Sequence, residues 1–77
     1  MAGNLARAAS DLQQYINAHP NSAAGAFDLA VVLDAMGQYQ QAMTWYDRAL
    51  QLGNKPYYSP ARAECARRMA AAQALSQ

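Results

Sequence analysis

The chain has 77 residues, of which 53% are hydrophobic and 14% are charged, and its formal net charge at pH 7 is +1. This length allows one small domain, the near-neutral charge excludes a strong general attraction to nucleic acid or membranes, and the single cysteine excludes an internal disulfide. Abundant alanine without long runs of β-branched residues predicts an all-helical fold.

The first predicted helix spans about residues 4–18, where apolar residues recur at intervals of three and four. Pro20 ends it, because the residue before a proline is pushed out of the helical region of backbone space. Asn21 or Ser22 then caps a second helix by accepting hydrogen bonds from its first free N–H groups. Gly37 ends this second helix, because glycine readily adopts the positive φ of a tight turn.

The third helix is predicted over about residues 39–52, and a Gly-Asn-Lys-Pro segment at residues 53–56 breaks the pattern. We expect Ser59 to cap the fourth helix, with Pro60 in its first turn, where the missing N–H of proline costs nothing. The sequence therefore predicts about four helices joined by short turns.

The chain nearly repeats itself at an offset of 34 residues. The matched pairs keep small residues small and apolar residues apolar: Gly3 with Gly37, Leu5 with Tyr39, Ala8 with Ala42, Leu12 with Tyr46, Tyr15 with Ala49 and Ile16 with Leu50. An offset of 36 residues fits the later part better, since it matches Pro20 to Pro56 and residues 29–33 to residues 65–69. A period of this length is typical of stacked helix pairs that bury their apolar faces against neighbours.

Residues 26–33 read Ala-x2-Leu-Ala-x2-Leu, and residues 42–49 read Ala-x3-Tyr-x2-Ala. Together they resemble the tetratricopeptide repeat pattern, from which the chain departs at Ala26, Ala30 and Asn54 in place of the usual tryptophan, glycine and proline. The resemblance implies antiparallel helical hairpins stacked as a short right-handed solenoid. Residues 1–20 would form half a repeat, residues 21–54 a full repeat, and residues 55–77 the first helix of a further repeat or a capping helix.

The resemblance also gives the motif residues packing roles. Ala42 and Ala49 are small where the two helices of a pair come closest, while Leu29 and Leu33 fill the space between the helices. Tyr46 is the large residue shared between neighbouring repeats. These roles predict a core built mainly from the second and third helices.

Residues that could carry chemistry are few. His19 precedes Pro20 without a cysteine or carboxylate beside it, so a solvated turn histidine is favoured over a metal ligand or general base. Cys65 falls on an apolar stripe without an activating base, which favours a small buried thiol. Trp45 is either an interface anchor or a partly buried residue. We therefore predict no catalytic, cofactor or metal site, and we expect that the protein is not an enzyme.

The resemblance implies a protein–protein interaction module that binds a peptide or helix of a partner protein. The first helix of each pair lines the groove of such modules, and the matching positions here are Ala24, Phe27, Asp28, Val31, Asp34, Ala35, Ala63, Arg67 and Ala70. Phe27 and Val31 stand where the family's carboxylate clamps are polar, so a segment with apolar anchors is expected, with a basic residue selected by Asp28 and Asp34. Burial of Phe27 by the neighbouring helix remains the alternative.

Two other functions stay open. A nucleic-acid-binding domain would use the basic last helix. Residues 55–77 contain four cations and one glutamate, a net charge of +3, whereas residues 1–54 contain two arginines and four aspartates, a net charge of −2. A purely structural role would pair apolar faces that the end helices expose, namely Leu5, Leu12 or Ile16 on the first and Ala66, Met69 or Ala70 on the last. Symmetric pairing through one face is the commonest solution for such a dimer.

The composition and the apolar runs of the sequence also predict where in the cell the protein is located. No apolar run approaches the roughly 18 residues of a membrane span, and residues 1–10 lack the apolar segment of a secretory signal. A lone cysteine fits a reducing compartment. We therefore expect a cytoplasmic protein without membrane contact.

Overall fold

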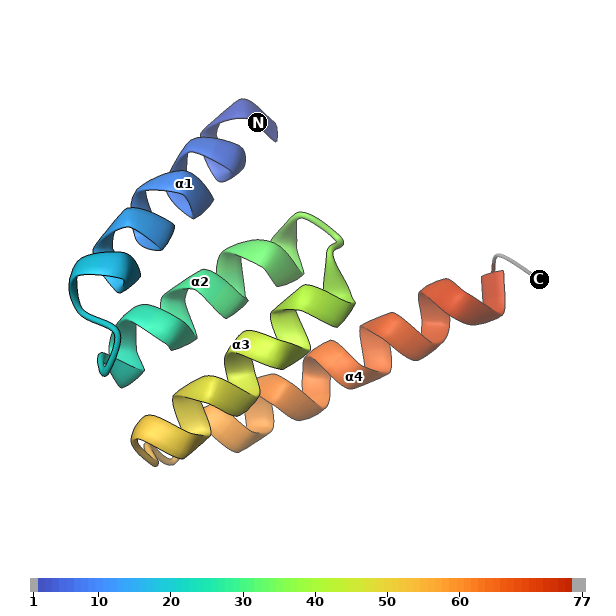
Figure 1. Cartoon of the computed structure of the whole chain (residues 1–77). Coiled ribbons are helices and arrows are strands. Elements are labelled where there is room, and N and C mark those ends of the chain that lie inside the picture. The colour runs from blue at the N-terminus through green and yellow to red at the C-terminus, as the bar shows by residue number, and fades with distance from the viewer. Residues whose placement is uncertain (1, 76–77) are drawn as a thin grey trace.

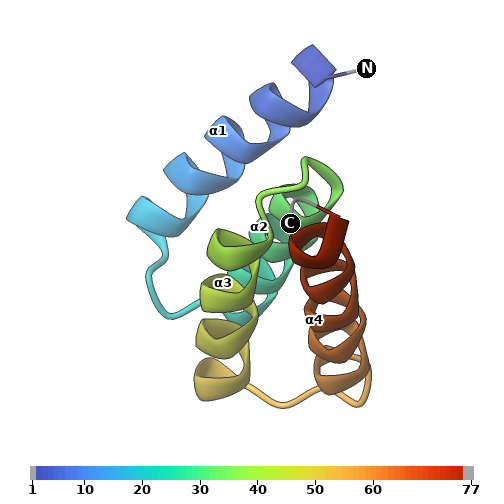
Figure 2. The same cartoon turned by 90° about the vertical axis from the view of Figure 1, so that its right-hand side faces the viewer.

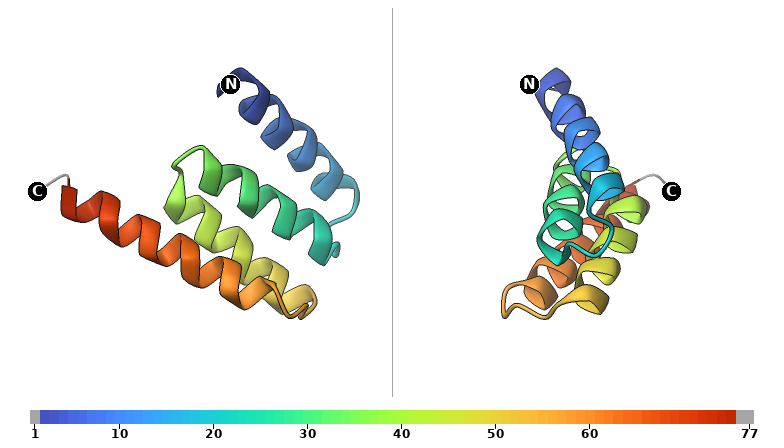
Figure 3. Two further views of the ribbon diagram at one scale, coloured as in Figure 1. Left: turned by 180° about the vertical axis from the view of Figure 1, so that it is seen from behind. Right: turned by 60° about the vertical axis from the view of Figure 1, so that its left-hand side comes forward.

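The computed structural model describes residues 2–75, which form four helices (Figure 1). These are α1 (Ala2–Ala18), α2 (Ala23–Ala35), α3 (Tyr39–Leu52) and α4 (Tyr58–Leu75), and each runs antiparallel to the one before it. Figure 3, seen from behind, shows the four helices lying side by side in chain order, each displaced from the one before it. The molecule measures 40 × 29 × 15 Å, so its smallest dimension is little more than one helix diameter and every helix has a face toward solvent.

The ends of α2 lie where the sequence predicts them. The hydroxyl oxygen of Ser22 accepts a hydrogen bond from the backbone N–H of Gly25 at 3.0 Å, which confirms Ser22 as the cap. Gly37 has φ +80°, a left-handed conformation that a residue with a side chain rarely adopts, and it turns the chain from α2 into α3.

The start of α4 differs from the prediction. The backbone N–H of Tyr58 donates to the carbonyl of Lys55 at 3.1 Å, so a turn already leads into the helix before Ser59. The helix begins at Tyr58, which places Ser59 inside the first turn, and the predicted Ser59 cap is therefore wrong. Pro60 does lie in the first turn, as expected.

The core is built around small residues on α2 and α3, whose contact is the most extensive between any two helices described. Ala30, Ala42 and Ala49 are fully buried, and Ala26 is 1% exposed. Tyr46 is also buried, as the repeat pattern predicts for the large residue between repeats. Methyl side chains let the two helix backbones approach closely, so that larger neighbours can fill the space around them.

Helix α1 packs against α2 at one end and leans away from the other helices (Figure 2). A Cβ atom on Gly25 would lie 3.1 Å from the Tyr15 ring, so glycine makes room for this ring. Ile16 is 7% exposed and belongs to the core cluster with Leu29 and Leu33. The expectation that Ile16 lies on an exposed end face is therefore wrong, whereas Leu5 and Leu12 are half-buried.

Helix α4 lies at the other end of the row of helices, where it packs mainly against α3. Cys65 and Tyr58 are buried, but Ala66 and Met69 are half-buried and Ala70 is exposed. Part of the apolar surface of α4 thus remains in contact with water, as the sequence predicts. Among the residues described, we find no helix with both the length and the apolar character needed to cross a membrane.

Replacing Ala49 by leucine tests the close approach of α2 and α3. Ala49 packs in one cluster with Ala26 and Tyr58, and the three extra carbons would force these neighbours apart. We expect urea unfolding to show a loss of about 1–3 kcal/mol in the free energy of unfolding.

Ala71→Leu is the matched control, because Ala71 is exposed on α4 and leucine has nearly the helix propensity of alanine. It should change the free energy of unfolding by less than about 0.5 kcal/mol. Equal stabilities for the two variants would contradict a tight contact at Ala49.

Candidate functional site

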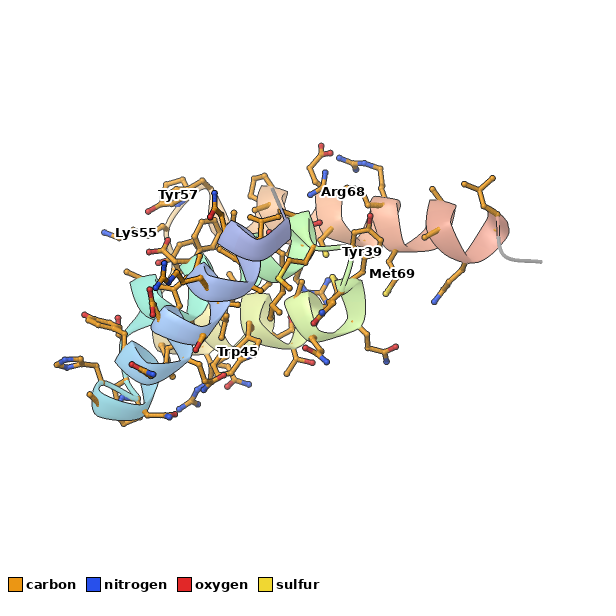
Figure 4. All side chains as sticks on the ribbon, turned by 90° about the horizontal axis from the view of Figure 1, so that it is seen from above. Tyr39, Trp45, Lys55, Tyr57, Arg68 and Met69 are labelled. Atoms are coloured by element: carbon orange, nitrogen blue, oxygen red, sulfur yellow. The ribbon has the colours of Figure 1, made fainter. Side chains whose placement is uncertain are left out.

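A shallow pocket of about 380 Å³ lies where α2, α3 and α4 meet. Its lining residues are Val31, Asp34 and Ala35 from α2, Tyr39 and Tyr46 from α3, and Arg68 from α4. Figure 4 shows Arg68 on one side of the molecule and Trp45 on the opposite side. The pocket therefore lies on the face where α2 and α4 come together, away from Trp45.

A buried polar network forms the floor of this pocket. The Asp34 side chain is 6% exposed, and its Oδ1 accepts a hydrogen bond from Arg68 Nε at 2.8 Å. Its Oδ2 accepts two more, from Arg68 Nη2 and from the Tyr46 hydroxyl, the latter at 3.1 Å. The Arg68 guanidinium thus donates two parallel hydrogen bonds to the Asp34 carboxylate, a geometry that fixes the orientation of both groups. One carboxylate therefore links α2, α3 and α4.

The network carries matched charges. The Arg68 guanidinium holds the pKa of the Asp34 carboxyl below its usual value, although burial of the carboxyl opposes this shift. Burial and the neighbouring Asp34 carboxylate raise the pKa of the Tyr46 phenol, so Tyr46 keeps its proton and donates it to the hydrogen bond. The floor of the pocket is consequently a neutral, fully paired unit at pH 7.

Cys65 lies beneath this network and is fully buried. Its Sγ lies 3.8 Å from the backbone carbonyl of Tyr39, to which the thiol donates. Burial raises the pKa of the Cys65 thiol, which disfavours the thiolate that a nucleophile requires. The interpretation of Cys65 as a small buried thiol is confirmed.

An aromatic cluster lies beside the amino-terminal half of α2. Phe27 stacks on Tyr58 with ring centroids 4.5 Å apart, and it makes edge contacts with Tyr57 at 5.2 Å and Tyr46 at 5.7 Å. Phe27 is half-buried, whereas the Tyr57 ring is 54% exposed. Phe27 therefore holds α2 against the start of α4, and removing its ring would disturb the fold as well as the surface.

The predicted groove residues fall into three groups. Ala24, Asp28, Val31, Ala35, Ala63, Arg67 and Ala70 are exposed, Phe27 is half-buried and Asp34 is buried. The carboxylate of Asp34 is occupied by Arg68, so it is not free to select a basic residue on a ligand, and that expectation needs correction. The pocket itself brings together only Val31, Asp34 and Ala35 of the predicted set.

Tyr39, Tyr46 and Arg68 line the pocket without having been predicted there. The sequence predicted Tyr46 only as a core residue, and it gave Arg68 only as one of the four cations of residues 55–77. The repeat pattern did not single out this pair, Asp34 and Arg68, because the offset of 36 residues that fits the later part of the chain matches Asp34 to Ala70 and not to Arg68.

All three arginines of α4 are paired with carboxylates of this chain. Arg62 pairs with Asp47 of α3, Arg67 with Glu64 and Arg68 with Asp34. A carboxylate oxygen of Glu64 also lies 3.9 Å from Arg68 Nη1, one helical turn away. These partners reduce the charge that α4 could offer to phosphate groups.

The remaining candidates for chemistry stay separate from the pocket. His19 is exposed and stacks on Tyr15 with ring centroids 4.5 Å apart. Across residues 2–75 no three His, Cys, Asp or Glu side chains gather as they would around a metal ion. Trp45 is half-buried against both core clusters, which agrees with partial burial.

Comparison with known proteins gives one finding. A family model described as tetratricopeptide repeat matches residues 1–65, which is most of the chain. The searches of curated proteins and of solved structures each gave no match.

Arg68→Met tests the network through its pH dependence. At pH 7 the variant leaves the buried Asp34 carboxylate without its cation, and we expect a loss of about 3 kcal/mol, the lower end of the range for broken buried pairs, because Arg68 is half exposed. The lowered pKa of Asp34 stabilises the wild type above the pKa of about 4 in the unfolded chain, and this contribution is lost as the pH falls through the folded-state pKa. The difference between the two proteins should therefore shrink below about pH 4.

Urea unfolding between pH 7 and pH 3 measures this difference. Arg67→Met is the control, because Arg67 is an exposed arginine whose partner Glu64 is three residues away on the same helix. It should cost less than about 0.5 kcal/mol at any pH. If both variants unfold alike and their pH curves run parallel, Asp34 and Arg68 do not stabilise the fold together.

Proposed function

Since the chain belongs to the tetratricopeptide repeat family, we propose that it is a protein-interaction module whose α2–α4 groove binds a peptide or helix of a partner protein. Repeats of this family generally mediate protein–protein interactions and are generally scaffold modules without enzymatic activity. The α2–α4 groove comprises the pocket described above and the exposed residues beside it, namely Asp28, Ala63, Arg67 and Ala70.

The observation that carries this proposal is an exposed apolar surface above a floor of paired, hydrogen-bonded side chains. Val31 is 42% exposed and lies in the pocket next to Ala35. Beneath them the Asp34–Arg68 pair is already satisfied, so an incoming side chain need not break it. A ligand residue can therefore remove apolar surface from water without reorganising the groove, which favours affinity.

The chemistry of the groove indicates the kind of ligand. Of the two apolar contacts that the sequence predicts, Phe27 is half-buried and Val31 is exposed, so an apolar anchor on the ligand suits Val31 and its neighbour Ala35. A basic residue on the ligand would meet Asp28, which is exposed and now stands as the acidic selector in place of Asp34. Tyr57 extends the apolar surface toward the start of α4. We therefore infer an amphipathic helix or extended segment with one apolar anchor and a basic residue nearby.

The nucleic-acid alternative has less support from the charges. Phosphate binding depends on cations that are free to replace counterions. Since all three arginines of α4 pair with carboxylates of the same chain, binding phosphate would require breaking these pairs.

A peptide-display selection with the purified protein as bait tests the proposed function. We expect enriched peptides to share an apolar residue close to a lysine or arginine. Val31→Asp should weaken their binding at least about tenfold in fluorescence polarisation, because anchor contacts concentrate binding energy.

Thr44→Asp is the matched control, because Thr44 is an exposed β-branched residue on α3 outside the groove. It should leave the dissociation constant within about twofold of the wild-type value. Enrichment of no common peptide, or equal effects of the two substitutions, would contradict binding in the α2–α4 groove.

A further inference from the structure

Helix α4 repeats the sequence of α2 but has a different environment. At the offset of 36 residues, Ala66 and Met69 correspond to Ala30 and Leu33. Ala30 is fully buried and Leu33 is 7% exposed in the cluster that holds α2 against α3. Ala66 and Met69 are only half-buried, because among residues 2–75 no helix packs on α4 as α3 packs on α2.

Helix α1 shows the complementary situation. At the offset of 34 residues, Ala8 and Leu12 correspond to Ala42 and Tyr46, which α3 buries against α2. Ala8 and Leu12 are half-buried, and Tyr15, which corresponds to Ala49, is 48% exposed. Helix α1 is therefore a relative of α3 whose equivalent face is only partly covered, since Leu12 packs against the core cluster but Ala8 and Tyr15 keep part of their surface in water.

A second pocket marks the place where a helix could pack on α4. It has a volume of about 400 Å³ and lies between the start of α3 and the later part of α4, with Tyr39, Met69 and Ala72 in its lining. Figure 4 shows Met69 and Tyr39 close to each other here. We name this surface the α3–α4 groove, and it adjoins the α2–α4 groove at Tyr39, which lines both pockets.

We propose that α1 of a second copy packs in the α3–α4 groove, taking the position on α4 that α3 takes on α2. Copies then associate head to tail, and each junction completes one helix pair. The lengths agree, since α1 has 17 residues and α4 has 18, about 26 Å each. The association needs no ligand in the α2–α4 groove, although the junction and that groove share Tyr39 and Ala70.

The residues that would meet at this junction are compatible. Within one chain, Asp34 on α2 accepts a hydrogen bond from Tyr46 on α3. The corresponding residues at the junction are Ala70 on α4 and Leu12 on α1, so a polar pair is replaced by an apolar pair. Because both partners change together, the junction would bury no unpaired polar group at this position.

Charge favours the head-to-tail arrangement over a symmetric one. Helix α4 carries three arginines and one glutamate, whereas α1 carries one arginine and one aspartate and is neutral. Pairing two α4 helices face to face would therefore bring two positive helices together, and packing α1 on α4 would not. The symmetric pairing expected from the sequence is thus less favourable than the heterologous contact.

A mixing experiment with two single-face variants tests the proposal. Ala72→Glu places a charge on an exposed residue of the α3–α4 groove, and Ala8→Glu places one on the matching face of α1. In sedimentation velocity the wild type should show a weight-average mass that rises with concentration above the monomer mass of 8.3 kDa. Each variant alone should remain a monomer, and an equimolar mixture should form a dimer and no larger species.

Two further variants serve as controls. Ala71→Glu adds the same charge to an exposed residue of α4 that lines neither groove, and it should associate like the wild type. Circular dichroism verifies that each variant is folded. If Ala8→Glu does not fold, Leu5→Glu takes its place, because a carboxylate near the amino end of a helix stabilises the helix. A monomeric wild type, or a mixture that stays monomeric, would overturn the proposal. Association of either Ala8→Glu or Ala72→Glu by itself would also overturn it. If Ala8→Glu associates and Ala72→Glu does not, the pairing is symmetric and runs through α4.

Discussion

The close approach of α2 and α3 is the constraint on which the rest of the structure depends. Ala26, Ala30, Ala42 and Ala49 are each at most 1% exposed, and their small side chains set the separation of the two helices. In a molecule only 15 Å across its narrowest dimension, one such contact provides much of the core. Tyr46 extends from this contact toward α4 and joins the hydrophobic core to the polar network.

That network gives the proposed binding surface its rigidity. Without the Asp34–Arg68 pair, α4 would meet α2 mainly through the aromatic rings around Phe27. With the pair in place, α2 and α4 are held at both ends of their contact, by aromatic rings at one end and by charged hydrogen bonds at the other. A groove whose walls are fixed in this way loses little conformational entropy when it binds a ligand.

Local chemistry explains what the sequence could predict. Pro20, Ser22 and Gly37 act on their own backbone neighbourhood, so the helix ends that depend on them were correct, and the buried alanines followed from the repeat pattern. The Ser59 cap failed because a turn hydrogen bond from Tyr58 to Lys55 starts the helix earlier. The pairing of Asp34 with Arg68 depends on how α4 stacks on α2, and single-sequence patterns do not encode that distance. For the same reason, exposed groove positions such as Val31 were predicted, but the occupied carboxylate was not.

Paramagnetic NMR on the complex tests the central claim most directly. A selected peptide carrying a nitroxide spin label beside its apolar anchor would broaden the amide signals of residues near the bound anchor. Binding in the α2–α4 groove predicts that the strongest broadening falls on Val31, Ala35 and Arg68, with α1 and the region around Trp45 unaffected. Broadening centred on α1, on Trp45 or on the α3–α4 groove around Met69 would contradict the account.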